Sequence, residues 1–548
     1  MNTRPTIRFV LSILLVLPLV SAACDDGTLE SDADADGDTD ADGDTDVDGD
    51  TDADIDVDAD GDWDGGSDSD RDADSEGDAH DDECPATCPA NQVCGFESHE
   101  CEDVRGNIFY FDPDAPDGGD GSFPTPWNSY QQVQTHAFEP GDDLFFRAGS
   151  IYRVPTDPND DSTWYRSFDI WDGRPSNPTV LGAYYGEGLF GLGGEPRPII
   201  DFQDFGGKRY NGAFDFNAEN SMGYVHIMNL QIANTNGIGI QISGRNAADG
   251  SVHDCWVYNC RTDNTDSMGI GLYFSINGLI ESCTVESSNQ EQKSNPMEPP
   301  HEGDFHAGNG IDINGMQQRG RTQYNTVRRC EVVHAYEGIG TYKGAEHTTV
   351  EQSIVRNCKT YYFYVSNSSY TTFRYNIAYA TENGRGGQDN IGSGFMIDNE
   401  GHNESIHVYD IHGHRIYGNF AAGLAEGIGL LNNSDIHGVY PDDIEVYDNI
   451  IVDCMRNYVF RQSSSSWNDI LYHDNFSFVF DDNAEGLAHS NNFSPEGVSW
   501  NNNFWNTEVV GNAATNENED DVELARESGW RNLPDGEVDT SFFDFQGE

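Results

Sequence analysis

The sequence predicts a parallel β-helix, a coil of short strands in which each turn, or rung, stacks on the one before. The first observation is a repeat: Cys330, Ser353 and Asn376 occupy the same place in three successive lines of residues 326–381, 23 residues apart. The second is composition, since the segments around these markers are short and rich in Val, Ile, Tyr and Phe, which favour strands. The third is that no helical pattern separates the segments, so strands of successive rungs pair in parallel.

The same marker position can be followed along the chain in both directions. It falls on Asn or a small residue at Asn229, Cys255, Cys283, Cys330, Ser353, Asn376, Asn419, Asn449, Asn475 and Asn503. A buried Asn in every rung can hydrogen-bond to the rungs above and below, so we expect an internal ladder with a structural role. Cys260, Cys358 and Cys454 are placed five residues after a marker and are expected to be small buried residues too.

Residues 1–23 are typical of a bacterial secretion signal. Two Arg precede an apolar run over residues 9–20, and three small residues follow it. The run is short and contains a Pro, so we do not expect a transmembrane helix. Cys24 comes next, an arrangement that resembles a lipoprotein signal. The resemblance implies a lipidated Cys24, an anchor in the outer membrane and display at the cell surface, with plain secretion as the alternative.

Residues 24–83 form an acidic tract in which Asp falls on nearly every second position of a long stretch. Such a segment cannot bury apolar surface and repels itself, so we predict a disordered spacer. Its D-x-D-x-D-G pattern is similar to the first half of an EF-hand calcium loop, but the closing Glu and the flanking helices are missing. Weak, diffuse association with calcium is the functional alternative.

Residues 84–106 carry four cysteines within a short span. In an exported chain this spacing predicts a small module with two disulfides, whose pairing the sequence leaves open. Zinc binding is the rival interpretation, but no C-x2-C pair occurs and the expected compartment is oxidising. The four cysteines are Cys84, Cys88, Cys94 and Cys101.

The net charge of −69 and the presence of only four Lys narrow the range of partners. They argue against nucleic acid, and no Gly-rich phosphate loop precedes a helix, so a nucleotide is not expected. A polyanionic sugar is also disfavoured unless calcium bridges the like charges. We expect a monomer. A saline habitat would account for the same acidic surface.

Residues 107–201 carry an ordered series of short signatures. A strand and an Asp/Gly turn lead to Gly-x4-Pro-Trp, a helical stretch expected to cap the coil, Pro-Gly-Asp, Ala-Tyr-Tyr-Gly and Pro-Ile-Ile-Asp, at 121–127, about 128–138, 140–142, 183–186 and 198–201. In this order they resemble the N-terminal cassette of right-handed β-helix proteins, common in the pectate-lyase-like superfamily of polysaccharide lyases and glycosidases.

That resemblance extends over roughly residues 107–510 and implies an all-β, right-handed parallel β-helix, followed by a C-terminal cap or tail at 511–548. It is specific for the fold, but it says little about activity because the superfamily hosts several chemistries.

Two intervals between markers are longer than the others, and they hold residues 289–310 and 382–415. Extra length in a solenoid forms loops on one face, often the binding face. Both segments contain several His that could hold a metal, although no zinc spacing is matched.

The Gly-Ile strands around these loops carry the candidate site. Side chains alternate along a strand, so one set points outward. This outward set includes Gln241, Tyr273, Asp312, Asn314, Tyr342, Asp398 and Arg461, with Glu337, Lys343 and Glu400 beside it. Acids, a Tyr and a rare Lys beneath two loops form a plausible saccharide groove. An ordinary solvated face is the alternative.

In β-helix lyases, a Lys or Arg removes the C5 proton of a uronic acid while calcium on acidic residues neutralises the substrate carboxylate. If this chemistry applies here, the register of the strands, rather than a family motif, points to Lys343 as the base with Tyr342 as a helper. The calcium ligands would be Asp312, Glu337 and Asp398, and the substrate contacts would be Asn314, Glu400 and Arg461.

The resulting hypothesis is a surface protein that acts on polysaccharide, foremost as a lyase. One alternative is a glycoside hydrolase, which needs two carboxylates about 5–9.5 Å apart. The other is a non-catalytic adhesion or structural protein that binds glycan without turnover.

Overall fold

The computed structural model describes residues between 87 and 505, all within the unit Glu76–Glu548. The predicted signal, the acidic spacer and the segment after residue 505 lie outside the described residues. The gaps are 90–91, 95–97, 104–105, 155–167, 170, 176, 204–211, 218–222, 236, 245–250, 289–307, 317–320, 381–391, 400–410, 433–440, 463–467, 479–484 and 490–496. No helix in the described part is long and apolar enough to cross a membrane.

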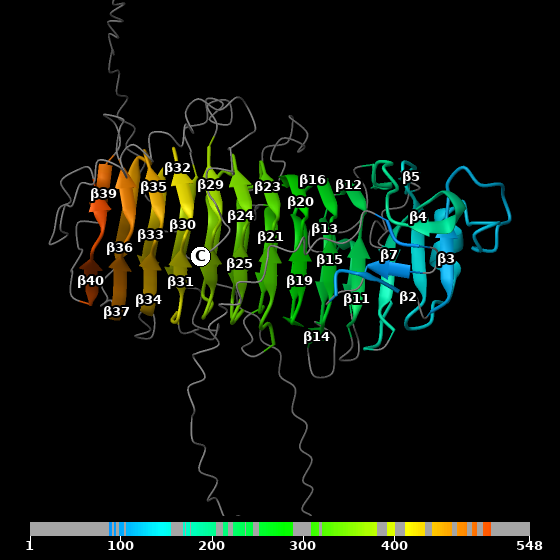
Figure 1. The fold of residues 1–548 in the computed structure, drawn as a ribbon, viewed down its shortest axis with the longest axis horizontal. Helices are drawn as coiled ribbons and strands as arrows, with labels where there is room; N and C mark the ends of the chain where they lie inside the picture. The colour runs from blue at the N-terminus through cyan, green and yellow to red at the C-terminus, as the bar shows by residue number, and fades with distance from the viewer. Residues whose placement is uncertain are drawn as a thin grey trace, which may run out of the picture. The chain divides into compact units, whose positions relative to one another are not determined.

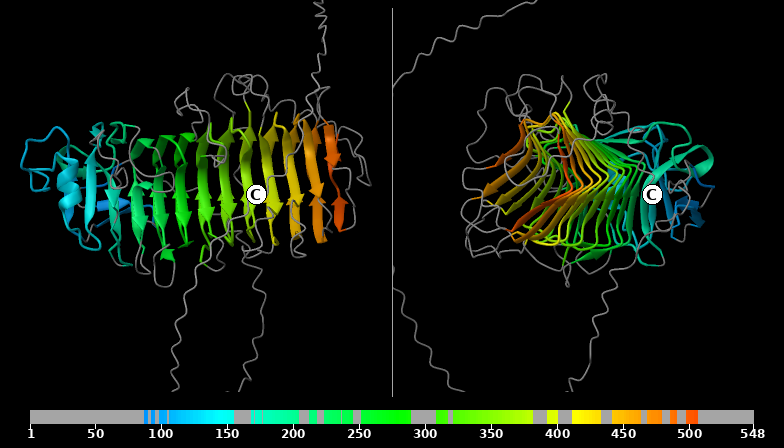
Figure 2. Two further views of the ribbon diagram at one scale, coloured as in Figure 1. Left: turned by 180° about the vertical axis from the view of Figure 1, so that it is seen from behind. Right: turned by 60° about the vertical axis from the view of Figure 1, so that its left-hand side comes forward.

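Three long sheets wind into a coil, which confirms the predicted all-β parallel β-helix (Figure 1). Most rungs contribute one strand to each sheet, and Figure 2 shows the strands of successive rungs stacked on one another. Within the described residues the sheets contain 11, 14 and 12 strands. Pairing along each sheet is parallel; the exception is a short strand that pairs antiparallel at the edge of the 14-stranded sheet.

The 11-stranded sheet consists of β6 (Phe168–Asp169), β10 (Gly212–Asn217), β13 (Ile238–Ser243), β17 (Met268–Tyr273), β21 (Asn309–Asn314), β24 (Glu337–Tyr342), β27 (Tyr361–Ser366), β30 (Ser393–Asn399), β33 (Glu426–Asn432), β36 (Arg456–Gln462) and β39 (Glu485–His489).

The 14-stranded sheet consists of β3 (Ile108–Phe111), β4 (Asp143–Arg147), β7 (Thr179–Tyr185), β11 (Val225–Met228), β15 (Trp256–Tyr258), β19 (Leu279–Glu281), β22 (Thr326–Arg328), β25 (Thr349–Glu351), β28 (Thr372–Arg374), β31 (Arg415–Tyr417), β34 (Asp442–Tyr447), β37 (Asn468–His473) and β40 (Val498–Asn501), with β8 (Leu189–Phe190) beside β7.

The 12-stranded sheet consists of β5 (Ile151–Arg153), β9 (Ile199–Asp201), β12 (Gln231–Thr235), β16 (Arg261–Thr265), β20 (Thr284–Ser288), β23 (Glu331–Val333), β26 (Ile354–Arg356), β29 (Ile377–Tyr379), β32 (Phe420–Ala422), β35 (Ile450–Val452), β38 (Phe476–Phe478) and β41 (Phe504–Trp505). A further parallel pair joins β14 (Val252–His253) and β18 (Ser275–Ile276), and a 3-10 turn lies at Gly186–Gly188.

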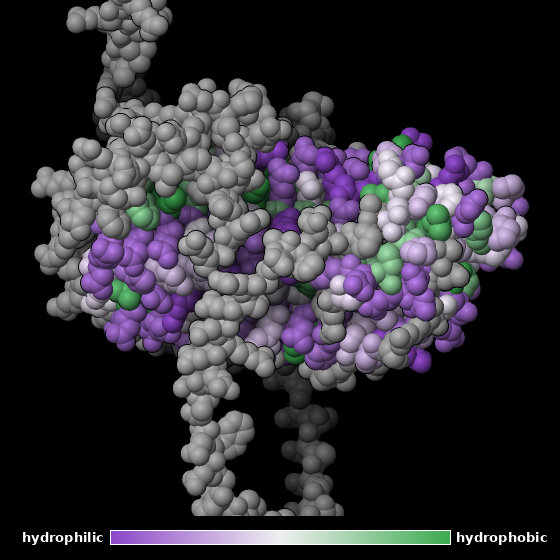
Figure 3. Space-filling model, viewed as in Figure 1, coloured by the Kyte–Doolittle hydropathy of each residue, from purple (hydrophilic) through white to green (hydrophobic). Residues whose placement is uncertain are grey.

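Each rung turns one apolar row inward, and the rows form a single continuous core. In the three repeats of residues 326–381 the inward residues are at most 1% exposed: Val327, Val350 and Phe373; Val332, Val355 and Ala378; and Ile339 and Phe363. The outer surface is mainly hydrophilic where Figure 3 shows described residues. Burial of these stacked rows is the main driving force for the coil.

The predicted cap at the N-terminal end of the coil is the short helix α1 (Tyr130–Thr135). Ser129 and Gln132 form a capping box, in which Ser129 accepts from the Gln132 N–H and Gln132 accepts from the Ser129 N–H at 3.1 Å. Val133 enters the core, and Trp127 stacks on Phe109 at a ring separation of 5.0 Å. The end of the core is thereby covered with aromatic side chains.

The internal ladder is present from Cys283 onward. Each marker N–H donates to the next side chain: Cys330 to Ser353, Ser353 to Asn376, Asn376 to Asn419, Asn419 to Asn449, Asn449 to Asn475 and Asn475 to Asn503, at 2.9–3.1 Å. These side chains are at most 2% exposed. The ladder therefore satisfies backbone groups that turn away from the sheets inside the coil.

Two of the assigned markers, Asn229 and Cys255, were wrong. Strand pairing aligns Gln231 with Arg261 and Thr284, so the ladder positions before them are Leu230 and Cys260. The N–H of Cys260 donates to Cys283 Sγ at 3.4 Å, as a ladder residue should. Asn229 lies one residue earlier, in a turn with φ of 61°, where Asn is favoured for a different reason.

The cysteine-rich module contains the antiparallel pair β1 (Gln92–Cys94) and β2 (Cys101–Asp103). The predicted disulfides are confirmed for Cys88–Cys101, and Cys94 is also disulfide-bonded. Cys84 lies outside the described residues. Val93 and Cys94 pack on the aromatic outer face of the 14-stranded sheet. The module is therefore an integral cover of that face.

An ion-pair cluster holds the module at the edge of this face. Glu281 is fully buried, and its carboxylate lies 2.8 Å from Arg328 Nε, 3.6 Å from Arg329 Nη1 and 3.3 Å from His99 Nε2. The His99 ring also meets Trp256 edge-on at 5.6 Å. A residue of the module thus contacts a buried carboxylate of the coil.

Replacing Glu281 with Gln is expected to lower the free energy of unfolding by about 2 kcal/mol, because two guanidinium groups lose a buried partner. The effect falls short of a fully buried pair since the side chains of Arg328 and Arg329 are 21% and 29% exposed. Chemical denaturation measures it. The matched control is Glu331→Gln, whose 2.9 Å pair with Arg356 is open to solvent and should cost at most about 1 kcal/mol. Equal losses would contradict the buried role of Glu281.

Candidate functional site

Strand pairing lines up the predicted site residues in two rows on the outer face of the 11-stranded sheet. The first row runs Gln241, Gly271, Asp312, Gly340, Tyr364, Met396 and Gly429. The second runs Ser243, Tyr273, Asn314, Tyr342, Ser366, Asp398 and Leu431. Asn314 therefore lies directly opposite Tyr342, and Asp312 lies opposite Gly340.

Glycine in the first row lets tyrosine fold back over the sheet. A Cβ at Gly340 would collide with the hydroxyl end of Tyr342, so the ring requires glycine there. The Tyr342 hydroxyl donates to Glu337 Oε2 at 2.7 Å. Tyr273 lies over Gly271 in the same way, and its hydroxyl donates to Met268 Sδ at 3.4 Å. The Tyr342 hydroxyl and the Glu337 carboxylate are thus brought next to the strand position opposite Asp312.

Asp312 is buried, and burial raises the pKa of its carboxyl to about 7. The negative charge of Glu337 adds to this increase in pKa, while hydrogen bonding to Asn314 and Tyr273 and the positive charge of Lys343 oppose it. Among the residues that the structure describes, Asp312 Oδ1 has no hydrogen-bond partner. The carboxyl is therefore poised to exchange a proton near neutral pH.

Lys343 follows β24 at a turn position with φ of 49° and is half-buried. It lies close enough to Asp312 to influence its ionisation. The structure thus brings together four of the predicted side chains, Asp312, Glu337, Tyr342 and Lys343, with Asn314 on the next row position. We expected this outward set to face solvent, but Asp312, Asn314 and Tyr342 are at most 7% exposed.

Asp398 is not part of this group. Two strands, β24 and β27, separate it from Asp312, which corresponds to about 14 Å. Its Oδ2 accepts from the Tyr364 hydroxyl at 3.3 Å, and the side chain is 2% exposed. Among the residues that the structure describes, no three His, Cys, Asp or Glu side chains are grouped to hold one metal ion. The predicted calcium ligands Asp312, Glu337 and Asp398 are thus not gathered at one point.

The remaining predicted substrate contacts are less defined. Arg461 lies on β36 opposite Leu431, one strand beyond the rows above. Glu400 and most of the two loop segments fall outside the described residues. Of the loop histidines, His414 faces inward, where burial lowers its pKa to about 3, and its Nδ1 accepts from the Thr371 N–H at 3.1 Å. His414 therefore has a structural role.

Sequence reasoning missed Tyr364, the hydroxyl partner of Asp398. Its strand, β27, lacks the Gly-Ile pair that marked the others, because tyrosine and phenylalanine replace it. The usable signal was the Gly-x-Tyr spacing at Gly271–Tyr273 and Gly340–Tyr342, which predicts tyrosines folded over glycine gaps on this face.

Residues 208–378 match the family model of the right handed beta helix region. No curated protein matches the chain. Solved structures with similarity include a GH136 lacto-N-biosidase from Eubacterium ramulus, with 13% identity, a TM-score of 0.48 and coverage of 72% of this chain and 68% of that one. A rhamnogalacturonan lyase has 14% identity and a TM-score of 0.44, covering 73% and 87% of the two chains.

A third is the tailspike protein of E. coli bacteriophage HK620 in complex with pentasaccharide, with 12% identity, a TM-score of 0.44 and coverage of 74% and 65%. The family match describes a right-handed β-helix, and the three sheets show its parallel strand pairing. The chain therefore folds as a right-handed parallel β-helix.

Proposed function

We propose that this protein cleaves a polysaccharide at the outer face of the 11-stranded sheet, with Asp312 as the proton donor. The observation that carries the proposal is the buried Asp312 carboxyl, whose pKa is raised to about 7 beside a second carboxylate. Cleavage of a glycosidic bond needs an acid that is still protonated near neutral pH, so that the leaving oxygen departs as a hydroxyl.

Glu337 is the second group that hydrolysis requires. It lies on the neighbouring strand, where its register partner is Asn309 and that of Asp312 is Gly340, and its charge is near enough to Asp312 to raise the pKa of that carboxyl. Hydrolysis requires two carboxyl groups about 5–9.5 Å apart. The Tyr342 hydroxyl orients it through the 2.7 Å hydrogen bond. In hydrolysis Asp312 protonates the bridging oxygen as the carbon–oxygen bond breaks. Glu337 then takes the proton of the attacking water, or attacks first and is released by water.

Elimination is the second candidate, and the position of Lys343 beside Asp312 favours it. Here the neutral amine of Lys343 removes the C5 proton of a uronic acid. The electron pair forms the C4–C5 double bond, the C4–O4 bond breaks, and Asp312 protonates O4. Asp312 is the acid in both reactions, so the two differ in whether Glu337 or Lys343 is essential. A calcium ion on acidic side chains near the site would neutralise an anionic sugar, and we propose this role only for elimination.

Asp312→Asn is expected to lower cleavage of a responsive glycan at least 100-fold, because the isosteric amide cannot donate an acidic proton. Reducing ends are measured across a panel of neutral and acidic polysaccharides, together with the ultraviolet absorbance of unsaturated uronates. The matched control is Asp114→Asn, whose side chain is 80% exposed at the N-terminal end. It should leave the rate unchanged.

The products and the companion variants separate the two reactions. Hydrolysis yields reducing ends without absorbance, is lost in Glu337→Gln and survives both Lys343→Ala and a calcium chelator. Elimination yields absorbance and is lost in Lys343→Ala and with the chelator. A panel on which the native chain cleaves nothing would sink the enzymatic proposal and leave glycan binding without turnover.

We also propose that the protein is displayed at the cell surface through a lipid on Cys24, with residues 25–83 as an acidic spacer. The basis is the order of the N-terminal segments in the sequence. Metabolic labelling with an alkyne fatty acid tests this: label that persists in Cys24→Ala would rule it out.

A further inference from the structure

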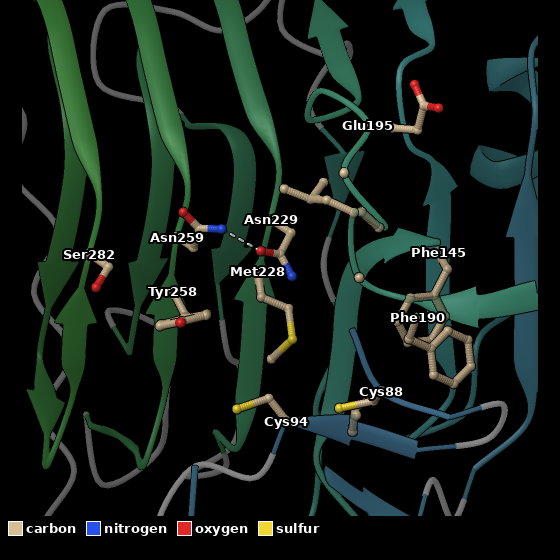
Figure 4. A pocket seen from close by; sticks show the side chains of 15 residues that line it. Cys88, Cys94, Phe145, Phe190, Glu195, Met228, Asn229, Tyr258, Asn259 and Ser282 are labelled. Atoms are coloured by element: carbon tan, nitrogen blue, oxygen red, sulfur yellow. Dashed lines mark hydrogen bonds between the residues drawn. The ribbon is translucent and has the colours of Figure 1, made fainter. Parts of the chain in front are cut away.

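A cavity of about 540 Å³ lies between the cysteine-rich module and the outer face of the 14-stranded sheet (Figure 4). We propose that it binds a neutral saccharide unit. Its lining comes from β4, β8, β11 and β15 of the coil and from Cys88, Val93 and Cys94 of the module. Its volume falls within the range of about 300–1,000 Å³ typical of small-ligand pockets.

One side of the cavity is apolar. Phe145 and Phe190 stack at a ring separation of 3.9 Å, and Met228 and Tyr258 lie beside them on β11 and β15. Val93 of the module belongs to the same hydrophobic cluster. Such a wall suits the C–H face of a sugar ring and would not suit a fully solvated ion.

The other side presents hydrogen-bonding groups without partners. Asn229 Oδ1 accepts from Asn259 Nδ2 at 2.6 Å, but within the described structure the Asn229 Nδ2 group donates to nothing (Figure 4). The Ser282 hydroxyl, also in the lining, likewise makes no side-chain hydrogen bond to described residues, whereas the exposed Glu195 carboxylate points away from the other labelled side chains (Figure 4). Asn229 and Ser282 offer a donor and a group that can donate or accept, which suits sugar hydroxyls.

The charges around the cavity select a neutral ligand. Among the described lining residues Glu195 is the one charged group. Arg197 is not part of the lining; it donates to the carbonyl oxygen of Asn259 at 2.8 Å and also contacts the Asn259 Oδ1. A uronate or phosphate would therefore enter a cavity whose one charged lining group is a carboxylate.

The backbone conformation fixes the positions of the polar groups that line the cavity. Asn229, Asn259 and Ser282 occupy the same turn in successive rungs, each with φ between 48° and 61°. The pairing of β11 with β15 and of β15 with β19 fixes their spacing. A ligand thus meets groups already held in place, which reduces the entropic cost of binding. The cavity is built on a different sheet from Asp312, so this inference does not rest on the proposed function.

Titration calorimetry and saturation-transfer NMR on the exported chain carrying Asp312→Asn test the proposal without turnover. The probes are lactose, cellobiose, maltose and N,N′-diacetylchitobiose, with digalacturonate as the anionic probe. We expect at least one neutral probe to bind and digalacturonate to fail at this site. The proposal is overturned if none of the four neutral probes binds, or if digalacturonate alone binds.

Asn229→Asp locates the site. It keeps the oxygen that accepts from Asn259 but removes the cavity-facing donors, so affinity for the neutral probe should fall at least tenfold. The control Asn277→Asp makes the same change at an exposed turn residue, also at positive φ (56°), and should not alter affinity. If Asn229→Asp fails to fold, Ser282→Ala tests the location of the site instead, and it should weaken binding of the neutral probe about threefold. Unchanged affinity in a folded Asn229→Asp chain contradicts the assignment.

The outcomes stay separate from those of the catalytic proposal. Binding that survives Asp312→Asn and is lost in Asn229→Asp supports the cavity even if no glycan is ever cleaved. Cleavage that is lost in Asp312→Asn while no neutral probe binds supports the catalytic site and overturns the cavity.

Discussion

Asn449→Ala is expected to lower the free energy of unfolding by about 4 kcal/mol. Asn449 is fully buried in the middle of the ladder. Its Nδ2 donates to the carbonyl oxygens of Ile416 and Tyr447, both at 2.8 Å, and to Asn475 Oδ1 at 2.9 Å. Its Oδ1 accepts from the N–H and Nδ2 of Asn419 at 3.0 Å.

Truncation of Asn449 leaves several buried polar groups without a hydrogen-bond partner at once. Each buried group left without a partner costs about 1–3 kcal/mol, and the empty volume adds to the loss. Some of the freed carbonyls retain a second hydrogen bond in the sheets, so the expected sum is about 4 kcal/mol rather than the full penalty for every group. The same argument predicts that the damage spreads along the ladder, because Asn419 and Asn475 each lose one of their own partners.

Guanidinium denaturation gives the global effect, and amide hydrogen exchange shows where it falls. A solenoid can open locally, so exchange should accelerate in the rungs around β32, β35 and β38 first. The control is Asn501→Ala, an exposed position at the end of β40, which should change stability by less than about 0.5 kcal/mol. Similar losses in the two variants would show that the ladder does not stabilise the coil.

The repeat predicted the ladder residues correctly from Cys283 to the end of the coil, and its errors lie before Cys283. From Cys283 to Asn503 every marker is a ladder residue, because a position inside the coil admits little beyond a small or amide side chain. Before Cys283 two cysteines compete for the marker position. Cys255 lies 28 residues before Cys283, whereas Cys260, the true ladder residue, lies 23 residues before it and keeps the period of the later repeats. Asn is favoured at left-handed turns as well as in ladders, so its identity alone does not distinguish the two.

The outward register of the candidate site was also predictable, since it depends only on alternation along strands. Burial was not, because the exposure of Asp312 depends on what lies over the face and local patterns do not encode that. The contact of His99 with Glu281 spans 182 residues and joins a module to a distant rung. Nothing in the spacing of either segment signals such a contact, and the cavity beneath the module escaped prediction for the same reason.

Raising the pH from about 4 to 8 is expected to destabilise the native chain through Asp312 by roughly 4 kcal/mol. The ordinary pKa of the carboxyl is 3.8 and its value in the folded chain is about 7. Between these values the folded state holds a proton that the unfolded state releases, so stability falls as pH rises. The contribution is complete below about pH 4, falls steadily between about pH 4 and 7, and is gone above about pH 7; a pKa difference of about three units corresponds to roughly 4 kcal/mol.

Asp312→Asn isolates this contribution from the many other acids of the chain. The amide does not titrate, so the difference in unfolding free energy between variant and native chain should grow between pH 4 and 8 and favour the variant at pH 8. The control Asp114→Asn, whose side chain is 80% exposed, measures the part of any difference that comes from removing a surface acid. A variant that is less stable than the native chain at pH 8 would contradict the prediction that burial destabilises the ionised Asp312 carboxylate.

The same titration links stability to chemistry. If Asp312 is the proton donor, cleavage should decline as the pH rises through about 7, the upper end of the interval in which the native chain loses stability. A carboxyl buried only for packing has no reason to be an acid rather than an amide, since Asn fills the same space at lower cost above neutral pH. A stabilised but inactive Asp312→Asn chain is therefore the result that most directly ties this face of the coil to catalysis. A stabilised chain with full activity would assign Asp312 no part in the reaction.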